Sequence, residues 1–309
     1  MIARAYSYDV TQVSNSHLKM FYSKRRASNS WEDVHVPLFV VDEEKCIRDG
    51  ICVETCPRWL IALENHAMVP VPTEDAEELC VNCGHCVAVC PTGAISLSTM
   101  KPEECPPIRK DWLLSPEQAE HFLRSRRSIR NYADKAVDRE VLSKLIQIAC
   151  YAPSGHNSQP VQWLVIYESD EVQRLAGLVV DWMRDVIYGQ PALAGSLNLD
   201  RIVAAWEAGK DRVCRNAPHM IVAHSPEDLA VARSACTIAL TYLGLAAPAF
   251  GLGACWAGYF DAAANLWPPL KDALELPDGH RSFGAMMIGY PKYEYKRMPL
   301  RDQARISWH

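Results

Sequence analysis

Seven cysteines crowd into residues 46–90 and constrain the chain more than any other feature does. Four of them have the spacing C-x2-C-x2-C-x3-C before a proline: Cys80, Cys83, Cys86 and Cys90. Three more fill the first, third and fourth positions of the same frame before another proline: Cys46, Cys52 and Cys56. The remaining position of that first run is Asp49. Thiols at such fixed, close spacing indicate a metal centre.

The two cysteine runs are copies of one unit. Each cysteine of the first run recurs 34 positions later in the second. Acidic residues precede both runs, at 42–44 and 75–78, and Ile61 and Ile95 follow them at the same interval. An internal repeat of this kind predicts two pseudo-symmetric halves.

This motif resembles that of the bacterial two-cluster ferredoxins. In such motifs three close cysteines bind one iron–sulfur cluster, and the cysteine before proline binds the other cluster. The resemblance therefore implies two 4Fe-4S clusters with ligands crossed between the repeats. One set would be Cys80, Cys83, Cys86 and Cys56, and the other would be Cys46, Asp49, Cys52 and Cys90.

Several alternatives remain open for this region. The cysteines could form a pair of zinc sites, or a disulfide framework if the protein were exported. A carboxylate is a harder ligand for iron than thiolate, so the Asp49 cluster could hold 4Fe-4S or lose iron to 3Fe-4S. Asp49 and Gly50 could instead form only a turn, with a non-protein ligand completing the site. His85 is expected to tune the potential rather than bind iron.

Charge is distributed unevenly along the chain. Lys and Arg number 32 against 37 Asp and Glu, and the net charge of -5 excludes a general nucleic-acid binder. Residues 37–100 carry ten acidic and three basic groups, whereas residues 1–36 carry three acidic and five basic groups. We expect residues 1–36 to form a solvated arm or to pair with the acidic surface.

The chain shows no signal for export or membrane insertion. No apolar run approaches the roughly 18 residues of a membrane span, and the N-terminal segment has no apolar stretch of signal-peptide length. These observations predict a cytoplasmic protein with no membrane partner. The length of 309 residues suggests about two domains.

The pattern of the sequence changes after Pro102, Pro106 and Pro107, where the cysteine runs have ended and helical patterns begin. We expect an arm at 1–36, a two-cluster domain at 37–100, a linker at 101–117 and a larger domain at 118–309. Helices are predicted to start after Ser115 and Asp138, which are capping residues. Further helices are expected at 170–188, 197–209 and 228–250, the last buried on both sides, with strands at 161–167, 220–223, 252–257 and 283–288. This order predicts an α+β sandwich.

Four segments of the larger domain, in this order, resemble the nitroreductase family. They are Arg126–Tyr132, Ala152–Pro160, Gly251–Gly258, and Gly289–Pro291 with Arg297 and Arg301. The resemblance implies FMN bound at the interface of an obligate homodimer. The glycines read G-x-G-x4-G after an apolar helix, so they do not form a dinucleotide fingerprint. We expect residues 291–309 to pack across the partner subunit.

The resemblance also implies roles for individual residues. The flavin phosphate would be held by Arg126, Ser128, Arg297 or Arg301, with Arg127 and Arg130 nearby. The polar edge of the ring would meet the partner subunit's copy of the 153–159 loop, through Pro153, Ser154, Gly155, Asn157 and Gln159. The backbone of Cys255, Trp256, Ala257 and Gly258 would lie along the flavin. His156 is a candidate proton donor. Each role has an ordinary alternative: the arginine run could be a solvated basic face, the 153–159 loop a simple turn, and Cys255 a buried apolar side chain. We expect the remaining cysteines to be structural: Cys105, Cys150, Cys214 and Cys236.

Two redox modules in one chain predict a function. Clusters pass single electrons, whereas a flavin can collect two and deliver a hydride. We expect an FMN-dependent oxidoreductase that passes electrons from reduced ferredoxin or NAD(P)H, through the clusters, to a nitroaromatic, a quinone or another activated unsaturated acceptor. Reductive dehalogenation, enone reduction and an electron-transfer hub for a protein partner are the alternatives.

Overall fold

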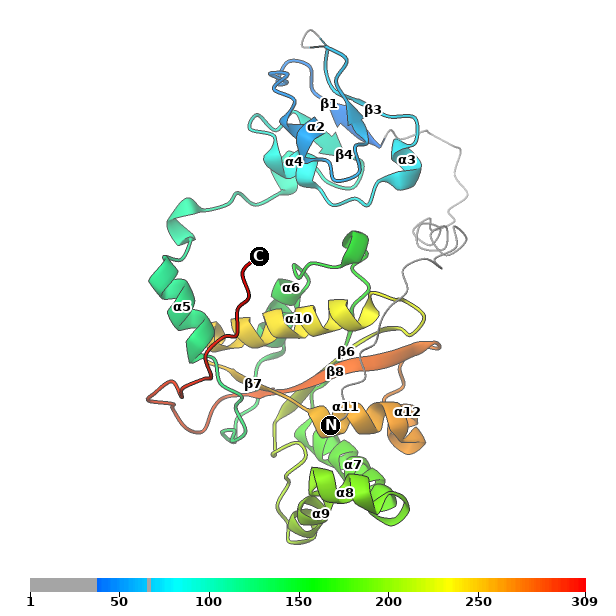
Figure 1. The fold of residues 1–309 in the computed structure, drawn as a ribbon, viewed down its shortest axis with the longest axis vertical. Helices are drawn as coiled ribbons and strands as arrows, with labels where there is room; N and C mark the ends of the chain where they lie inside the picture. The colour runs from blue at the N-terminus through cyan, green and yellow to red at the C-terminus, as the bar shows by residue number, and fades with distance from the viewer. Residues whose placement is uncertain (1–37, 66–67) are drawn as a thin grey trace. The chain divides into compact units, whose positions relative to one another are not determined.

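A computed structural model describes residues 38–65 and 68–309 of the chain, so the arm expected at residues 1–36 lies outside the described residues. The chain divides into two compact units between Lys110 and Asp111, and Figure 1 colours it by residue number. We refer to residues 38–110 as the cysteine unit and to residues 111–309 as the sheet unit. Among the described helices, none has the length and apolar character needed to cross a bilayer.

The cysteine unit consists of two small antiparallel sheets and three short helices. The sheets pair β1 (Phe39–Val41) with β4 (Ile95–Leu97), and β2 (Ile61–Ala62) with β3 (Val71–Pro72). The helices are α2 (Ile51–Thr55), α3 (Ala76–Leu79) and α4 (His85–Val89), and the 3-10 turns η3 (Pro102–Glu104) and η4 (Lys110–Trp112) follow. The buried core is small and includes Phe39, Val87 and Ile95.

The sequence repeat is also a repeat of backbone conformation. Helices α2 and α4 begin 34 positions apart, after Gly50 and Gly84, whose φ angles are 75° and 71°. Two further left-handed residues stand at the same interval, Arg48 with φ 59° and Asn82 with φ 51°. Equivalent backbone amides donate to equivalent sulfurs: Leu60 to Cys56 Sγ at 3.4 Å and Ala94 to Cys90 Sγ at 3.2 Å. The pseudo-symmetry that the cysteine spacing predicts is therefore present in the fold.

A four-stranded antiparallel sheet organises the sheet unit. Its strand order is β5 (Gln162–Ile166), β6 (His219–Pro226), β8 (His280–Gly289) and β7 (Gly253–Trp256). All four strands lie where strands are predicted, but β8 begins three residues early and β6 also extends beyond both predicted ends. The additional residues include His280, Arg281 and His224, which hydrophobic runs do not mark.

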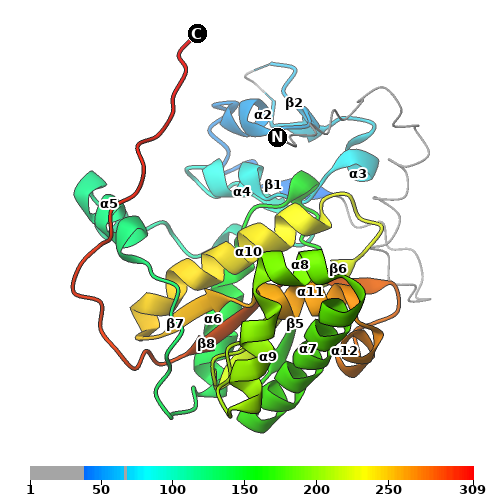
Figure 2. The ribbon, with the colours of Figure 1, turned by 60° about the horizontal axis from the view of Figure 1, so that its bottom comes forward.

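Helices cover both faces of this sheet. One face carries α6 (Arg139–Ala149) and α10 (Ala232–Ala246), whose buried side chains form a single core with that face. The other face carries α7 (Ser169–Gly189), α8 (Pro191–Leu197), α9 (Leu199–Glu207), α11 (Gly258–Leu266) and α12 (Pro268–Ala273). Figures 1 and 2 show these layers. The predicted α+β sandwich is confirmed.

Two helix starts test the predicted caps. Helix α5 (Pro116–Ser125) begins after Ser115, whose Oγ accepts from the Gln118 amide at 3.2 Å, while Gln118 Oε1 accepts from the Ser115 amide at 2.9 Å. This cap is confirmed. Asp138 does precede α6, but its side chain makes no capping hydrogen bond, so its predicted role there is wrong. Its backbone carbonyl instead accepts from Val141 and Leu142.

Two of the helix predictions need correction. The segment predicted as one helix at 228–250 is α10 followed by the 3-10 turn η6 (Ala247–Phe250), which contains Pro248. Within this chain α10 is buried on one side only, because Thr237, Thr241 and Tyr242 are exposed. Small alanine and threonine side chains occur on both buried and exposed faces of helices, so the sequence did not reveal the exposed face of α10. The helix predicted at 197–209 is α9, separated from α8 by the left-handed Asn198.

Candidate functional site

Two hollows in the cysteine unit are each surrounded by four candidate ligands. One is lined by Cys56, Cys80, Cys83 and Cys86. The other is lined by Cys46, Asp49, Cys52 and Cys90. Each hollow takes three of these residues from one repeat and the fourth from the other. His85 lines the first hollow and is exposed at the start of α4.

The zinc alternative requires donors that converge on a single point. A tetrahedral zinc ion needs its thiolates within about 2.3 Å of a single point. No three His, Cys, Asp or Glu side chains in residues 38–65 and 68–309 converge in that way. The crossed grouping around the hollows, with three residues from one repeat and the fourth from the other, is the arrangement that two-cluster motifs use.

Burial opposes ionisation of several thiols in these hollows. Desolvation raises the pKa of Cys86 to about 11 and also raises the pKa values of Cys52 and Cys80. Burial also acts on Cys90, but hydrogen bonds from Ala94 and Thr92 outweigh it and lower the pKa of that thiol. A bound cation would displace the protons, because metal ligation requires thiolate.

Asp49 occupies the position that Cys83 holds in the second repeat. Both residues precede the left-handed glycine that begins a helix. Asp49 is exposed, and its Oδ1 accepts from the Ile51 amide at 3.2 Å. One carboxylate oxygen thus supports the start of α2, and the Asp49 side chain also lines the hollow.

Three of the four nitroreductase-like segments meet at one edge of the sheet. The Ile129 amide donates to the Ala254 carbonyl of β7 at 3.1 Å, and the Lys292 amide donates to the Asn131 carbonyl at 3.0 Å. A Cβ built on Gly253 would lie 2.2 Å from Ile129 Cγ1. The close contact with Ile129 therefore requires a glycine at position 253.

The predicted phosphate ligands are not all brought together. Arg126 and Ser128 are half-buried beside that edge, but Arg127 turns back and donates to the carbonyls of Arg126 and Arg124, both at 2.7 Å. Beyond Pro291 the described chain has neither helix nor strand. Arg297 and Arg301 are exposed on this segment, with no hydrogen bond or ion pair to any described residue.

A cavity of about 450 Å³, which we name the β7 cavity, lies at the end of β7. Its lining includes five predicted residues: Arg130, Cys255, Trp256, Ala257 and Gly258. A Cβ on Gly258 would meet no atom within 4 Å, so this position is open to a ligand. The cavity also includes residues that the sequence analysis missed, notably Trp182, Arg212, Arg215 and Tyr259.

The two additional arginines belong to a loop built around Asp211. Its Oδ1 accepts from the amides of Val213 and Cys214 at 2.8 and 2.9 Å. Its Oδ2 accepts from the Asn216 amide at 2.8 Å and from Gln173 Nε2 at 3.0 Å. An aspartate that accepts from following backbone amides is a recognisable turn former. That turn was the one signal in the sequence that could have identified this loop.

The fourth segment, Ala152–Pro160, lies at the opposite edge of the sheet, before β5. Pro153, Ser154 and Gln159 line a smaller cavity of about 100 Å³. Ser154 Oγ accepts from the Gln159 amide at 2.9 Å, and Gln159 Nε2 donates to Asn157 Oδ1 at 3.1 Å. His156 is exposed, with φ 52°. Three strand spacings of about 4.8 Å separate β5 from β7. Within one chain, the edge beside Ala152–Pro160 and the edge beside the other three segments are therefore roughly 14 Å apart.

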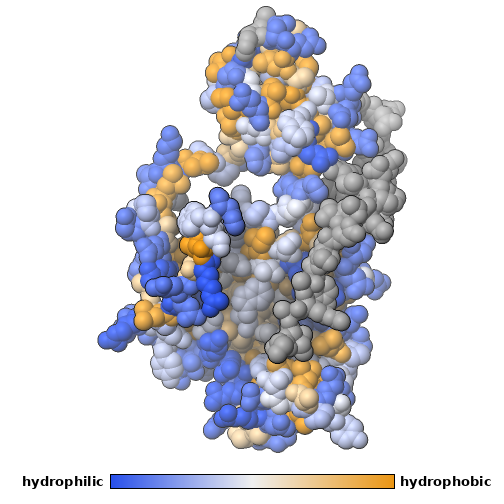
Figure 3. All heavy atoms as spheres, viewed as in Figure 1, coloured by the Kyte–Doolittle hydropathy of each residue, from blue (hydrophilic) through white to orange (hydrophobic). Residues whose placement is uncertain are grey.

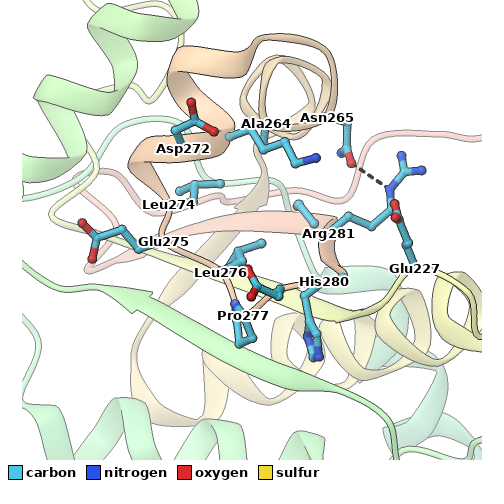
Figure 4. Close-up of a pocket in the computed structure, with 14 residues that line it drawn as sticks. Glu227, Ala264, Asn265, Asp272, Leu274, Glu275, Leu276, Pro277, His280 and Arg281 are labelled. Atoms are coloured by element: carbon cyan, nitrogen blue, oxygen red, sulfur yellow. Dashed lines mark hydrogen bonds between the residues drawn. The ribbon is translucent and has the colours of Figure 1, made fainter.

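Another cavity, of about 440 Å³, lies at the start of β8 (Figure 4). It contains none of the predicted site residues. Charges of both signs line it, from Glu227, Asp272 and Glu275 to Lys271 and Arg281. Arg281 Nε donates to Asn265 Oδ1 at 2.9 Å. With Asp278, four carboxylates and two basic groups line the cavity, and they form no recognisable catalytic or binding set, so we assign it no role.

Beside this cavity, a buried histidine makes stability depend on pH. His224 is 5% exposed, and its Nδ1 lies 3.0 Å from Nδ1 of His280. Burial, followed by the charge of His280, lowers the pKa of His224 to about 4. The unfolded chain titrates near 6.5 and so binds more protons below that pH. Stability should therefore be complete above pH 6.5 and fall by about 2 kcal/mol by pH 5.

Chemical denaturation at pH 8 and pH 5 measures this loss. The variant His224→Gln should show a smaller pH dependence, whereas His121→Gln, at an exposed position on α5, should behave as the wild type does. An undiminished pH dependence in His224→Gln would assign the effect to other groups.

Comparison with known families matches both units. A family described as "Nitroreductase family" matches residues 123–290, and one described as "4Fe-4S dicluster domain" matches residues 45–95. The first match covers more than half of the chain and includes the β7 cavity. The second covers both cysteine runs.

Individual relatives have low sequence identity to this chain, but the alignments span most of each relative's length. An Archaeoglobus fulgidus protein provisionally named NADH dehydrogenase/NAD(P)H nitroreductase is 25% identical over 178 residues, which is 58% of this chain and 88% of that protein. The 5,6-dimethylbenzimidazole synthase of Rhodospirillum rubrum is 26% identical over 195 residues, 59% of this chain and 85% of that protein. A solved nitroreductase with bound FMN from Desulfitobacterium hafniense has a TM-score of 0.51 at 22% identity, over 63% of this chain and 99% of that one. The last similarity shows a shared fold.

Proposed function

The chain belongs to the nitroreductase family and carries a 4Fe-4S dicluster domain, and from this we propose that it is an iron–sulfur flavoprotein oxidoreductase. Electrons enter at the cysteine unit from a one-electron donor such as reduced ferredoxin, and leave from FMN to a small organic acceptor. Nitroaromatics, quinones and other activated unsaturated compounds are the proposed acceptor class. NAD(P)H is the alternative donor.

One observation carries the proposal. The same chain contains two hollows, each lined by candidate ligands crossed between repeats, and a cavity of about 450 Å³ at the edge where three nitroreductase-like segments meet. Clusters exchange one electron at a time, and a flavin joins such carriers to two-electron chemistry. A fused donor module also raises the effective concentration of donor at the flavin.

The residues of the β7 cavity fit a flavin. The open face at Gly258 admits a ring against the backbone, and the guanidinium of Arg130 supplies a cation that has no carboxylate partner among the described residues. Arg126 and Ser128 are placed to hold a phosphate by charge-assisted hydrogen bonds. FMN bound there would accept single electrons and pass two to an organic molecule.

Metal and flavin analysis tests the proposal directly. Protein purified without oxygen should contain about eight irons per chain with matching acid-labile sulfide, or about seven if the Asp49 cluster is 3Fe-4S. Denaturation should release one FMN per chain. Zinc without sulfide, or FAD in place of FMN, would contradict the assignment.

The variant Asp49→Cys should retain iron better than the wild type. Thiolate is the softer ligand, so the fourth iron of that cluster should resist loss during exposure to air or mild oxidant. Electron paramagnetic resonance of the oxidised protein, which detects 3Fe-4S, measures the difference. The matched variant Asp75→Cys, in the acidic stretch before the second run, should change nothing, because it precedes the ligand frame. An unaltered spectrum in Asp49→Cys would mean that Asp49 does not bind iron.

We further propose a two-fold dimer in which each partner completes the other's flavin site. One chain separates the two halves of the site, and it leaves apolar surface uncovered. Helix α5 buries none of its residues, and Trp112, Leu113 and Leu123 are exposed. Figure 3 shows hydrophobic side chains at several places on this face of the molecule. The C-terminal segment likewise exposes Trp308. Light scattering should give twice the 34.6 kDa chain mass, and a flavin-loaded monomer would contradict the proposal.

A further inference from the structure

The β7 cavity carries three positive charges and no negative one. Arg130, Arg212 and Arg215 line it, and no Asp or Glu does. None of the three guanidinium groups forms an ion pair within residues 38–65 and 68–309. Unpaired arginines around a partly enclosed space indicate an anionic ligand.

The chain fixes two of these arginines in place. Arg212 and Arg215 are on the turn whose backbone amides donate to the Asp211 carboxylate, and Arg215 itself is left-handed, with φ 61°. Arg130 and Arg215 come from distant segments, yet both lie near the buried Tyr132. Burial raises the pKa of that phenol, and both guanidinium groups act in the opposite direction. Arg130 and Arg215 therefore lie near the same side chain, and both line the cavity.

The other walls are flat and apolar. Trp182, Trp256 and Tyr259 contribute aromatic rings, and Tyr259 Oη donates to the Leu197 carbonyl at 3.2 Å, which ties α11 to the end of α8. Aromatic walls beside arginines favour a planar ring that bears a carboxylate or a phosphate.

Resting on the proposed function, we propose that the β7 cavity selects an anionic acceptor, with Arg212 and Arg215 binding its carboxylate or phosphate beside the flavin. These arginines lie outside the set Arg126, Ser128, Arg297 and Arg301 proposed for the FMN phosphate. The acceptor class thereby narrows to planar unsaturated acids.

A matched pair of acceptors tests the charge preference. 4-Nitrobenzoate and 4-nitrobenzamide have nearly the same shape and the same nitro group, but only the first is an anion. Photochemically reduced holoenzyme is mixed with each acceptor without oxygen. The reduced flavin gives up two electrons and two protons, the nitro group becomes a nitroso group, and one water is released. The rate of flavin reoxidation is then measured against acceptor concentration.

We expect 4-nitrobenzoate to react at least about tenfold more efficiently at low concentration, since a hydrogen bond to a charged group contributes about 1.5–3 kcal/mol. In Arg212→Gln and Arg215→Gln protein that retains FMN, the ratio of the two efficiencies should fall towards one, because the acid loses its charge partner. Arg215→Lys should retain part of the preference. The control Arg201→Gln, an exposed position on α9, should match the wild type. If the Gln variants do not fold, benzoate should still bind wild-type holoenzyme at least about tenfold more tightly than benzamide, as measured from the flavin spectrum.

Other outcomes overturn the inference in distinguishable ways. Equal reactivity of the acid and the amide in FMN-loaded wild-type protein removes the inference and leaves the oxidoreductase assignment intact. Loss of FMN from the Gln variants would mean that the arginines bind the cofactor. A weakened NAD(P)H reaction with an unchanged acid preference would assign them to the dinucleotide. Wild-type protein that binds no FMN would instead refute the proposed function itself.

Discussion

The variant Cys83→Ser should lose acceptor turnover driven by reduced ferredoxin or reduced viologen. Cys83 lines the hollow whose other three thiols belong to Cys56, Cys80 and Cys86, and serine is a poor ligand for iron in a thiolate site. Without that cluster, one-electron input has no route to the flavin within the chain. Because the cluster is a required step between the donor and the flavin, we expect turnover with these donors to fall at least about a hundredfold. FMN should remain bound.

Cys105→Ser is the matched control. Cys105 lies in the same unit but outside the repeat frame, and its Sγ donates to the Lys101 carbonyl at 3.4 Å. This variant should keep its iron and its activity. Direct NAD(P)H-driven activity, if present, should survive in both variants. If turnover with the one-electron donor persists after loss of the cluster, the clusters are not part of this reaction, and the protein is a simple flavin reductase.

The variant Arg126→Ala should release FMN. Arg126 is half-buried directly after α5, beside the edge where the nitroreductase-like segments meet. A phosphate dianion left without its guanidinium partner loses a charge-assisted hydrogen bond worth about 1.5–3 kcal/mol. That loss corresponds to an FMN dissociation constant raised roughly 10- to 100-fold. Equilibrium titration of the flavin-free protein with FMN measures the change.

Arg124→Ala provides the comparison, because Arg124 is exposed on the last turn of α5 and pairs with Glu120 four residues earlier. Its removal should leave FMN affinity unchanged. Stoichiometric FMN with unaltered affinity in Arg126→Ala would place the phosphate elsewhere. Release of FMN from both variants equally would indicate damage to α5 rather than loss of a phosphate ligand.

Local spacing explains what the sequence could predict about the cysteine unit. The positions of Cys46 to Cys90 are fixed by short intervals along the chain, and both the pseudo-symmetry and the crossed grouping follow from those intervals. The sequence also shows that Asp49 takes the place of a cysteine at one position of the repeated motif. The strands of the sheet unit were similarly predictable, since each contains a short apolar run.

Tertiary contacts explain what the sequence could not predict. Arg212 and Arg215 join the β7 cavity only because the Asp211 turn sets them beside Arg130, which is more than 80 positions earlier. The glycine at position 253 is required by Ile129, which belongs to another segment of the chain. The exposed face of α10 was hidden by small residues that suit either side of a helix. In each case the deciding neighbour is distant in sequence.

The short helices of the cysteine unit set the separation of its two hollows. Helix α2 carries Cys52, which lines one hollow, and ends at Cys56, which lines the other; α4 does the same with Cys86 and Cys90. Four helical residues span about 6 Å, so each helix fixes the distance between two thiols that line different hollows. One inserted residue would rotate the second thiol by about 100° and detach it. An inserted residue in either helix would therefore remove one of the four candidate ligands from one hollow and leave the other three in place.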